Sequence, residues 1–300
     1  MLISKFLSPK NDYAFKQIFG KEKNQAILIH FINDILNFQG PDAIQTVKFL
    51  NPNQHPDIAF RKQSLIDVLC EDQQGRQHII EMQVAKTKGF EKRAQYYAAR
   101  AYSQQLNQSN EYEQLKGVIF IAITDFVMFP DKSNYYSTHW ILDNQSYSYG
   151  LKDFSFTFLE LPKFHKQSHE LTTTLEKWMY FFKHAEHTGE AESIEVAGQD
   201  TIILQAYEAL NRFNWSDNEL KIYEQETKRD RDARAIVAQQ VSDAEARGET
   251  RGEARGEARG IDKTIEVIKL LNKGLSLSEI AVQIGVTEEA VTAIANKLLS

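Results

Sequence analysis

The stretch from Leu65 to Tyr97 constrains the fold more than any other part of the sequence, because it combines two apolar runs, a turn signal and a basic segment. Gln73-Gln74-Gly75 suits a three-residue hairpin loop, in which a type I turn is followed by a residue with positive φ, and glycine adopts that conformation without steric cost. The turn predicts two antiparallel strands in which Asp72 faces Arg76. Every other residue pair in the hairpin follows from that register.

Two acidic residues are expected to oppose each other in this hairpin. Counting outward from the turn places Asp67 across from Glu81, and cross-strand neighbours share a face with Cβ atoms about 4.5–5.5 Å apart. Gln83 lies on the same face, because strand side chains alternate with a period of two. The surrounding positions are mostly apolar, so we expect both carboxylates to be partly desolvated. Carboxylates this close repel each other, so that one takes up a proton or both hold a cation.

The ligand chemistry of this pair favours a hard cation. Oxygen ligands without a nearby Cys or His pair suit Mg²⁺ or Mn²⁺ better than zinc. The alternative is a register shifted by one residue, in which case Asp67 and Glu81 are solvated surface acids. Spacing alone leaves both alternatives open.

Composition bounds the class of protein. Of the 300 residues, 42% are hydrophobic, which is enough for a sizeable core. Cys70 is the single cysteine, which excludes an internal disulfide and suits a reducing cytoplasm. No apolar run approaches the roughly 20 residues that span a bilayer. The apolar stretch in Met1–Lys10 is too short for a secretory signal, so we expect a cytoplasmic protein with no membrane partner.

The charge distribution restricts how the chain can contact nucleic acid. A net charge of −6 argues against indiscriminate binding by the whole surface, so any such binding is expected to be local. Between Val84 and Arg100, five basic residues against one acid give a balance of +4. This segment contains the basic helix expected at Gly89–Leu106.

Hydrophobic periodicity predicts an α/β fold with a small mixed sheet flanked by helices. The expected elements are a helix with Asp12 as N-cap and a break near Gly20, a short strand at Thr46–Leu50, the basic helix, a strand buried on both faces at Gly117–Thr124, a strand through Phe154, Phe156 and Phe158, and a helix through Leu171, Leu175, Trp178 and Phe182.

The composition changes beyond about Glu190. A helical segment is expected at 191–244, followed at 245–260 by the four-residue repeat EARG, ETRG, EARG, EARG. On a helix, steps of four drift by about 40° each, so Glu, Arg and Gly form separate stripes. Each glycine destabilises the helix by about 1 kcal/mol relative to alanine. The repeat is either a flexible tether or an oligomerising helix whose Gly stripe lets a second copy approach while Arg meets Glu.

The final segment, 261–300, resembles a small helix-turn-helix unit. Ser276 and Glu279 suit a capping box, and Gly285 precedes a second N-cap at Thr287. Glu288 and Glu289 stand at the start of the second helix, where phosphates and bases would approach a DNA reader. Four lysines minus five acids give the segment a charge of −1, which favours a structural or partner-docking role over sequence reading.

Five segments together resemble, in order and spacing, the PD-(D/E)XK nuclease family transposases, also called recombination-promoting nucleases: SPKNDYAFKQIFG, LIDVLC, IIEMQ, FEKRAQYYAARAYSQQL and LELPKF. The resemblance spans about residues 8–165, within a nuclease-like domain expected at 1–190. It implies a restriction-endonuclease-like α/β core with an all-helical C-terminal extension. It also implies Mg²⁺-dependent (or Mn²⁺-dependent) endonuclease cleavage of DNA in recombination or mobile-element biology.

By position, the resemblance assigns Asp67 and Glu81 to the metal with help from the Met82 carbonyl, and Gln83 to the place that a lysine usually holds. A lysine there would orient the attacking water and stabilise negative charge, whereas a glutamine orients water by hydrogen bonding and lends no charge. The alternative is a catalytically weak or inactive DNA-binding or assembly protein on a nuclease fold.

Other polar residues have two interpretations each. Asp12 either caps the first helix or adds a further acid to the site. Arg93 and Tyr97, one helical turn apart, either face the phosphate or, as favoured for Tyr97, pack in the core. Three lysines are candidates for sequence-independent contacts to the DNA backbone, or are ordinary solvated side chains: Lys16, Lys88 and Lys92.

Overall fold

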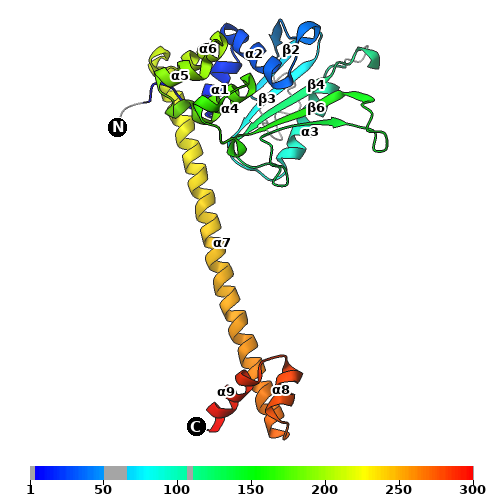
Figure 1. Ribbon diagram of the computed structural model, residues 1–300, viewed down its shortest axis with the longest axis vertical. Coiled ribbons are helices and arrows are strands. Elements are labelled where there is room, and N and C mark those ends of the chain that lie inside the picture. The colour runs from blue at the N-terminus through cyan, green and yellow to red at the C-terminus, as the bar shows by residue number, and fades with distance from the viewer. Residues whose placement is uncertain (1–3, 51–65, 107–110, 300) are drawn as a thin grey trace. The chain divides into compact units, whose positions relative to one another are not determined.

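The computed structural model describes residues 4–50, 66–106 and 111–299 (Figure 1). The chain separates into two compact units, Met1–Asp230 and Arg231–Ser300. The first unit is built on a mixed six-stranded sheet with the order β1-β2-β3-β4-β6-β5. Its strands are β1 (Val47–Phe49), β2 (Val68–Asp72), β3 (Gln77–Gln83), β4 (Val118–Thr124), β5 (Tyr136–Ile141) and β6 (Leu151–Glu160). This arrangement confirms the restriction-endonuclease-like α/β fold.

The centre of the sheet is parallel and its margins are antiparallel. β4 pairs in parallel with β3 on one side and with β6 on the other, and all seven of its residues are buried. A strand covered on both faces needs apolar side chains at every position, which is why its sequence is a continuous apolar run. β5 pairs antiparallel with β6 at the sheet edge and is only partly buried, so its sequence carries no apolar periodicity and it was not predicted.

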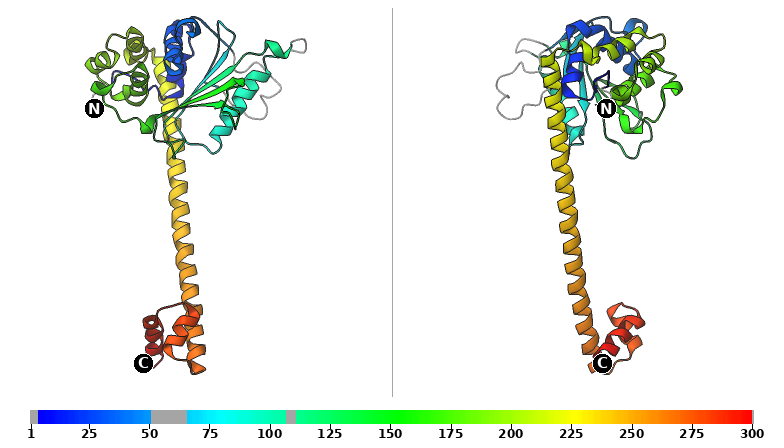
Figure 2. Two further views of the ribbon diagram at one scale, coloured as in Figure 1. Left: turned by 45° about the vertical axis from the view of Figure 1, so that its right-hand side comes forward. Right: turned by 90° about the vertical axis from the view of Figure 1, so that its left-hand side faces the viewer.

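Helices cover both faces of this sheet (Figure 2). One face packs against α1 (Asp12–Phe19), α2 (Gln25–Leu36) and α4 (Thr174–His184) around an aromatic-rich core that includes Phe15, Phe31 and Trp178. The other face packs against α3 (Phe90–Ser103), the basic helix. The side chains of α3 that were expected in the core are all buried: Phe90, Ala94, Tyr97, Ala98 and Ala101.

Two details of these helices differ from the sequence-based expectations. The N-cap of α1 is Asn11, whose side chain accepts from the N–H of Ala14, and Asp12 is the first helical residue. Asn fills this role as well as Asp, so the sequence offered two adjacent caps. Leu171 lies before α4, which begins after Thr173 with a capping box to Glu176.

The first unit continues past residue 190. The helices α5 (Glu190–Ala197) and α6 (Thr201–Ala209) contribute Val196, Ile203 and Tyr207 to the core on the α1 side. α7 (Asp217–Asn272) begins in this unit, where the hydroxyl of Tyr223 accepts from the N–H of Ser8 at 3.0 Å. The N-terminal segment is therefore held by a helix that lies more than 200 residues further along the chain.

The second unit contains the rest of α7, with the tetrad repeat in helical conformation, followed by α8 (Leu277–Ile284) and α9 (Glu288–Leu299). The end of α7 packs with α8 and α9 through Val267, Ile280 and Val291. The predicted capping box of Ser276 and Glu279 is present. Across the helices that the structure describes, none is both long and apolar enough to cross a membrane.

Candidate metal centre

The β2–β3 hairpin has the register that its turn predicts. The N–H of Asp72 donates to the carbonyl of Arg76 at 3.0 Å, and Gly75 has a φ of 81°. The ladder pairs Val68 with Ile80, and its next step places Asp67 opposite Glu81. The one-residue shift that would have left both acids solvated is therefore excluded.

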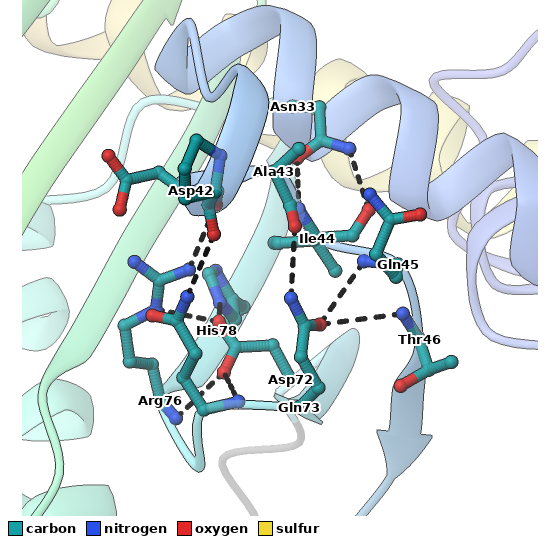
Figure 3. A network of polar contacts seen from close by, with 12 residues as sticks. Asn33, Asp42, Ala43, Ile44, Gln45, Thr46, Asp72, Gln73, Arg76 and His78 are labelled. Carbon is teal, nitrogen blue, oxygen red and sulfur yellow. Dashed lines mark hydrogen bonds and ion pairs between the residues drawn. The ribbon is translucent and has the colours of Figure 1, made fainter.

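A polar network around Asp72 fixes this register at the turn (Figure 3). Oδ1 of Asp72 accepts from the N–H groups of Gln74 and Arg76, at 2.9 and 3.0 Å. Oδ2 lies 2.7 Å from Nε of Arg76 and 2.9 Å from Nε2 of His78. Burial would raise the pKa of Asp72, but the hydrogen bonds from His78 and Arg76 outweigh it and hold the pKa down at about 2. Asp72 therefore stays ionised near neutral pH, and its carboxylate accepts the hydrogen bonds of the turn.

The same network ties the turn to the segment before β1 (Figure 3). Gln73 accepts from the N–H of Gln45 at 3.1 Å and donates to the carbonyl of Ala43 at 2.9 Å. Asn33 of α2 holds both backbone groups of Ile44, at 2.8 and 2.9 Å. The far end of the hairpin is thus fixed to α2, which restricts how the acidic end can shift.

Asp67 and Glu81 lie together at the other end of the hairpin. The N–H of Asp67 donates to Oε1 of Glu81 at 3.3 Å, and Oδ2 of Asp67 accepts from the N–H of Met82 at 2.9 Å. The Asp67 side chain is 8% exposed and Glu81 is 4% exposed. The two carboxylates are therefore desolvated neighbours, each linked to the backbone of the opposite strand.

This environment raises the pKa of both acids in the metal-free protein. Burial raises the pKa of Glu81 to about 8, and the Asp67 charge adds to the effect while Arg93 opposes it. Burial likewise raises the pKa of Asp67 to about 7, although the ammonium of Lys16 works in the opposite direction. Burial disfavours the charged forms of both acids, so a cation that binds the two carboxylates stabilises those charged forms.

Lys16 of α1 reaches this pair. Its Nζ lies 3.2 Å from Oδ1 of Asp67, and 2.7 and 2.9 Å from the two carboxylate oxygens of Asp12. Asp12 does not cap its helix; its carboxylate holds Lys16 one turn further along. No pattern in the sequence predicts the contact between Lys16 of α1 and Asp67 before β2, because the two residues are 51 positions apart.

Gln83 lies at the end of β3 on the face of Glu81 and contacts α3. Its side-chain carbonyl accepts from Nη2 of Arg93, and its amide donates to the carbonyl of Ala85 at 3.0 Å. The guanidinium of Arg93 lies over the Phe90 ring, 4.8 Å from the centroid. Arg93 therefore faces the acidic pair, whereas Tyr97 is 4% exposed and packs in the core as expected.

The other predicted lysines lie at the surface. Lys88 and Lys92 are exposed, before and at the start of α3. Lys86, three residues after Gln83, donates to the carbonyl of Val127 at 3.1 Å. The structure thus brings Lys16, Gln83 and Arg93 to the acidic pair and leaves Lys88 and Lys92 on the solvent side.

The donor set fits a hard divalent cation. Mg²⁺ is commonly held by one or two carboxylates, with water and substrate oxygens completing its shell. Because the N–H and C=O of one strand residue point to the same side, the Met82 carbonyl faces the side on which its N–H meets Asp67. In the described ranges, no group of three or more His, Cys, Asp or Glu residues is placed to hold a metal ion.

These features define the class of protein: a mixed sheet between helical layers, with one acid directly before β2 and a second on β3 beside it, is a restriction-endonuclease-like core. The chain belongs to the PD-(D/E)XK nuclease family transposases, whose family model matches residues 9–240. The match runs through α6 and into α7, beyond the segments whose motifs carry the resemblance. Comparisons with curated proteins and with solved structures gave no match.

Proposed function

We propose that the protein is a divalent-metal-dependent DNA endonuclease that acts in DNA recombination or mobile-element biology. Membership of a nuclease family supports the reaction class and DNA as the substrate. The observation that carries the proposal is the desolvated pair of Asp67 and Glu81, because burial disfavours the charged form of both carboxylates and a bound metal ion would favour it.

Asp67, Glu81 and the carbonyl of Met82 would hold Mg²⁺ or Mn²⁺ in this proposal. The bound ion would polarise the scissile phosphate and lower the pKa of a coordinated water. Gln83 is fixed at both ends of its amide, which leaves one N–H and one lone pair free to orient water. Fixed dipoles of this kind need no reorganisation during the reaction.

The DNA backbone would lie along α3 and the segment before it. Lys88 and Lys92 are exposed there, and Arg93 extends from the same helix toward Gln83. Lysine contacts to phosphate position a duplex without reading its sequence. The lone Cys70 is buried and free, which agrees with a site of action in the reducing cytoplasm.

Besides DNA, we propose a second copy of the chain as a partner, bound through α7. Val237 and Val241 are 58% and 52% exposed, and at about 100° per residue both lie within about 20° of Gly248, the first repeat glycine. Exposed valines that continue into a glycine stripe allow a second copy to approach closely, while the Glu and Arg stripes of the repeat supply complementary charge. These features favour an oligomerising helix over a tether.

The nuclease proposal is tested on supercoiled plasmid with Mg²⁺, Mn²⁺ or EDTA. We expect nicking by the wild type that EDTA abolishes, and loss of nicking in Asp67→Asn and Glu81→Gln, which change charge but not shape. Nicking that persists in both variants would overturn the assignment of this site. If no divalent metal supports cleavage while DNA still binds, the protein is the non-catalytic DNA-binding alternative.

A further inference from the structure

We propose that Lys16 supplies, from α1, the positive charge that the strand position of Gln83 lacks, and that its ammonium binds the scissile phosphate. This inference rests on the proposed nuclease function and assigns a catalytic residue to it. Among the residues that the structure describes, Arg93 is the other cation that faces the acidic pair, and its guanidinium is held by the Gln83 side-chain carbonyl and the Phe90 ring.

The location of Lys16 fits this role. Its Nζ lies 3.2 Å from Oδ1 of Asp67, so the ammonium is at the carboxylate that would hold the metal. A phosphate bridged to that metal would come within reach of the same ammonium. Lys16 approaches from the layer of α1, whereas Gln83 and Arg93 face the layer of α3. The acidic pair thus has the Lys16 ammonium on the α1 side, and Gln83 and Arg93 on the α3 side.

The side chain of Lys16 is held by Asp12 and is partly exposed to solvent. The Lys16 side chain is 31% exposed, compared with 8% for Asp67, so a partly exposed lysine contacts a buried acid. Asp12 holds it from the preceding turn through both carboxylate oxygens. Asp12 is therefore a positioning residue: its side chain is 51% exposed, so the ammonium is held between a buried acid and a solvent-exposed one.

The charges at the site support the same assignment. Three acids, Asp12, Asp67 and Glu81, face Lys16 and Arg93. Lys16 is in direct contact with Asp67, with its Nζ 3.2 Å from Oδ1. A lysine has three rotatable N–H donors on a flexible stem, so it can exchange one carboxylate oxygen for a phosphate oxygen without moving its helix. Arg93 lacks this freedom, because its guanidinium is held by the Gln83 side-chain carbonyl and lies over the Phe90 ring.

The principal test removes the positive charge at position 16 and introduces one at position 83. Single-turnover cleavage at saturating Mg²⁺ and DNA is compared in wild type, Lys16→Met, Gln83→Lys and the double variant. Removing one electrostatic donor lowers the rate by about 10²–10³-fold. We expect a loss of that size in Lys16→Met and recovery of at least ~10-fold when Gln83→Lys is added. The control is Lys23→Met, which removes an exposed lysine in the turn after α1 and should cleave like wild type.

A binding measurement separates catalysis from support of the metal site. Mn²⁺ binding to the DNA-free protein is measured by calorimetry. Lys16→Met is expected to bind Mn²⁺ at least as tightly as wild type, because the substitution removes a cation that contacts the same carboxylate. Weaker Mn²⁺ binding in parallel with the lost cleavage would overturn the proposal in favour of a structural role.

Chemical rescue gives a second test on a protein that is already folded. In Lys16→Cys, alkylation with 2-bromoethylamine rebuilds a lysine-like ammonium, whereas methyl methanethiosulfonate adds bulk without charge. The native Cys70 is fully buried and is shielded from both reagents. We expect aminoethylation alone to raise the cleavage rate by at least ~10-fold; equal rates after both treatments would overturn the proposal.

The failure of this inference differs from that of the proposed function. A wild-type protein that cleaves DNA, with Lys16→Met as active as Lys23→Met, overturns the role of Lys16 alone. A wild-type protein that cleaves no DNA with any divalent metal overturns the nuclease function and, with it, the role of Lys16.

Discussion

The N–H of Asp67 donates to Oε1 of Glu81 at 3.3 Å, so the two acids of the candidate site are linked directly across the hairpin. The link places two buried carboxylates side by side. Such a pair reduces the stability of the metal-free fold, which is a common property of sites that bind charged ligands.

Replacing Glu81 with Gln should therefore stabilise the metal-free protein. The pKa of Glu81 is raised from 4.5 to about 8 by burial and by Asp67, so folding loses stability as the pH rises above 4.5 and the loss is complete above about pH 8. At pH 8 in EDTA, Glu81→Gln should increase the free energy of unfolding by about 1–2 kcal/mol, or the melting temperature by a few degrees. The gain should shrink toward pH 4.5, and calorimetry at both pH values measures it.

Replacing Asp72 with Asn should have the opposite effect. The carboxylate of Asp72 is a buried acceptor for two N–H groups, Arg76 and His78, and Asn presents an N–H₂ to one side of that network. The expected loss is about 2–4 kcal/mol by chemical denaturation at pH 7. Because the folded pKa is lowered to about 2, the contribution of Asp72 is present above about pH 4 and falls as the pH approaches 2, and the difference between wild type and variant should narrow accordingly.

Lys92 and Arg93 are adjacent in sequence and should differ in their effect on DNA. Lys92 is exposed, so Lys92→Met should weaken DNA binding and reduce the magnitude of the salt dependence by about one unit of slope. Arg93 holds Gln83, so Arg93→Met should also lower the single-turnover cleavage rate at saturating DNA. Fluorescence anisotropy over a salt series, with Ca²⁺ in place of Mg²⁺, measures binding without cleavage. Equal cleavage rates for both variants at saturating DNA would contradict the distinction.

A charge on the valine stripe of α7 should abolish self-association. Val241→Glu places a carboxylate on the exposed stripe that continues into the repeat glycines, and sedimentation equilibrium should then give the mass of one chain. Ala246→Glu is the matched control, because Ala246 is exposed and lies about 160° around the helix from Gly248. A wild type that sediments as a single chain at all concentrations would support the tether, as would an unchanged oligomeric state after deletion of Glu245–Gly260.

Local sequence signals were sufficient wherever short-range physics decides the outcome. Gly75 fixed the turn, the turn fixed the register, and the register placed Asp67 opposite Glu81. The continuous apolar run of β4, the core face of α3 and the capping box at Ser276 were also readable from sequence alone. Each depends on neighbours within a few residues or on one periodic pattern.

Elements whose stability comes from distant partners were not readable in this way. The edge strand β5 is held by β6 and has no periodicity of its own. Asn11 and Asp12 are both residue types that favour the N-cap, and the cap that forms, Asn11, also donates to the Tyr223 carbonyl at 3.2 Å, 212 residues away in sequence.

By itself, the sequence determined the hairpin, its two facing acids, the α/β plan and the family, because turn chemistry and strand alternation are local and fixed in period. Only the tertiary structure decided how deeply the acids are buried, which raises their pKa values, and which cations reach them. The contacts of Lys16 with Asp67 and of Arg93 with Gln83 join different elements, and such contacts depend on how helices pack across a sheet. No spacing along the chain encodes that packing, so the site's charge balance appears only in the folded protein.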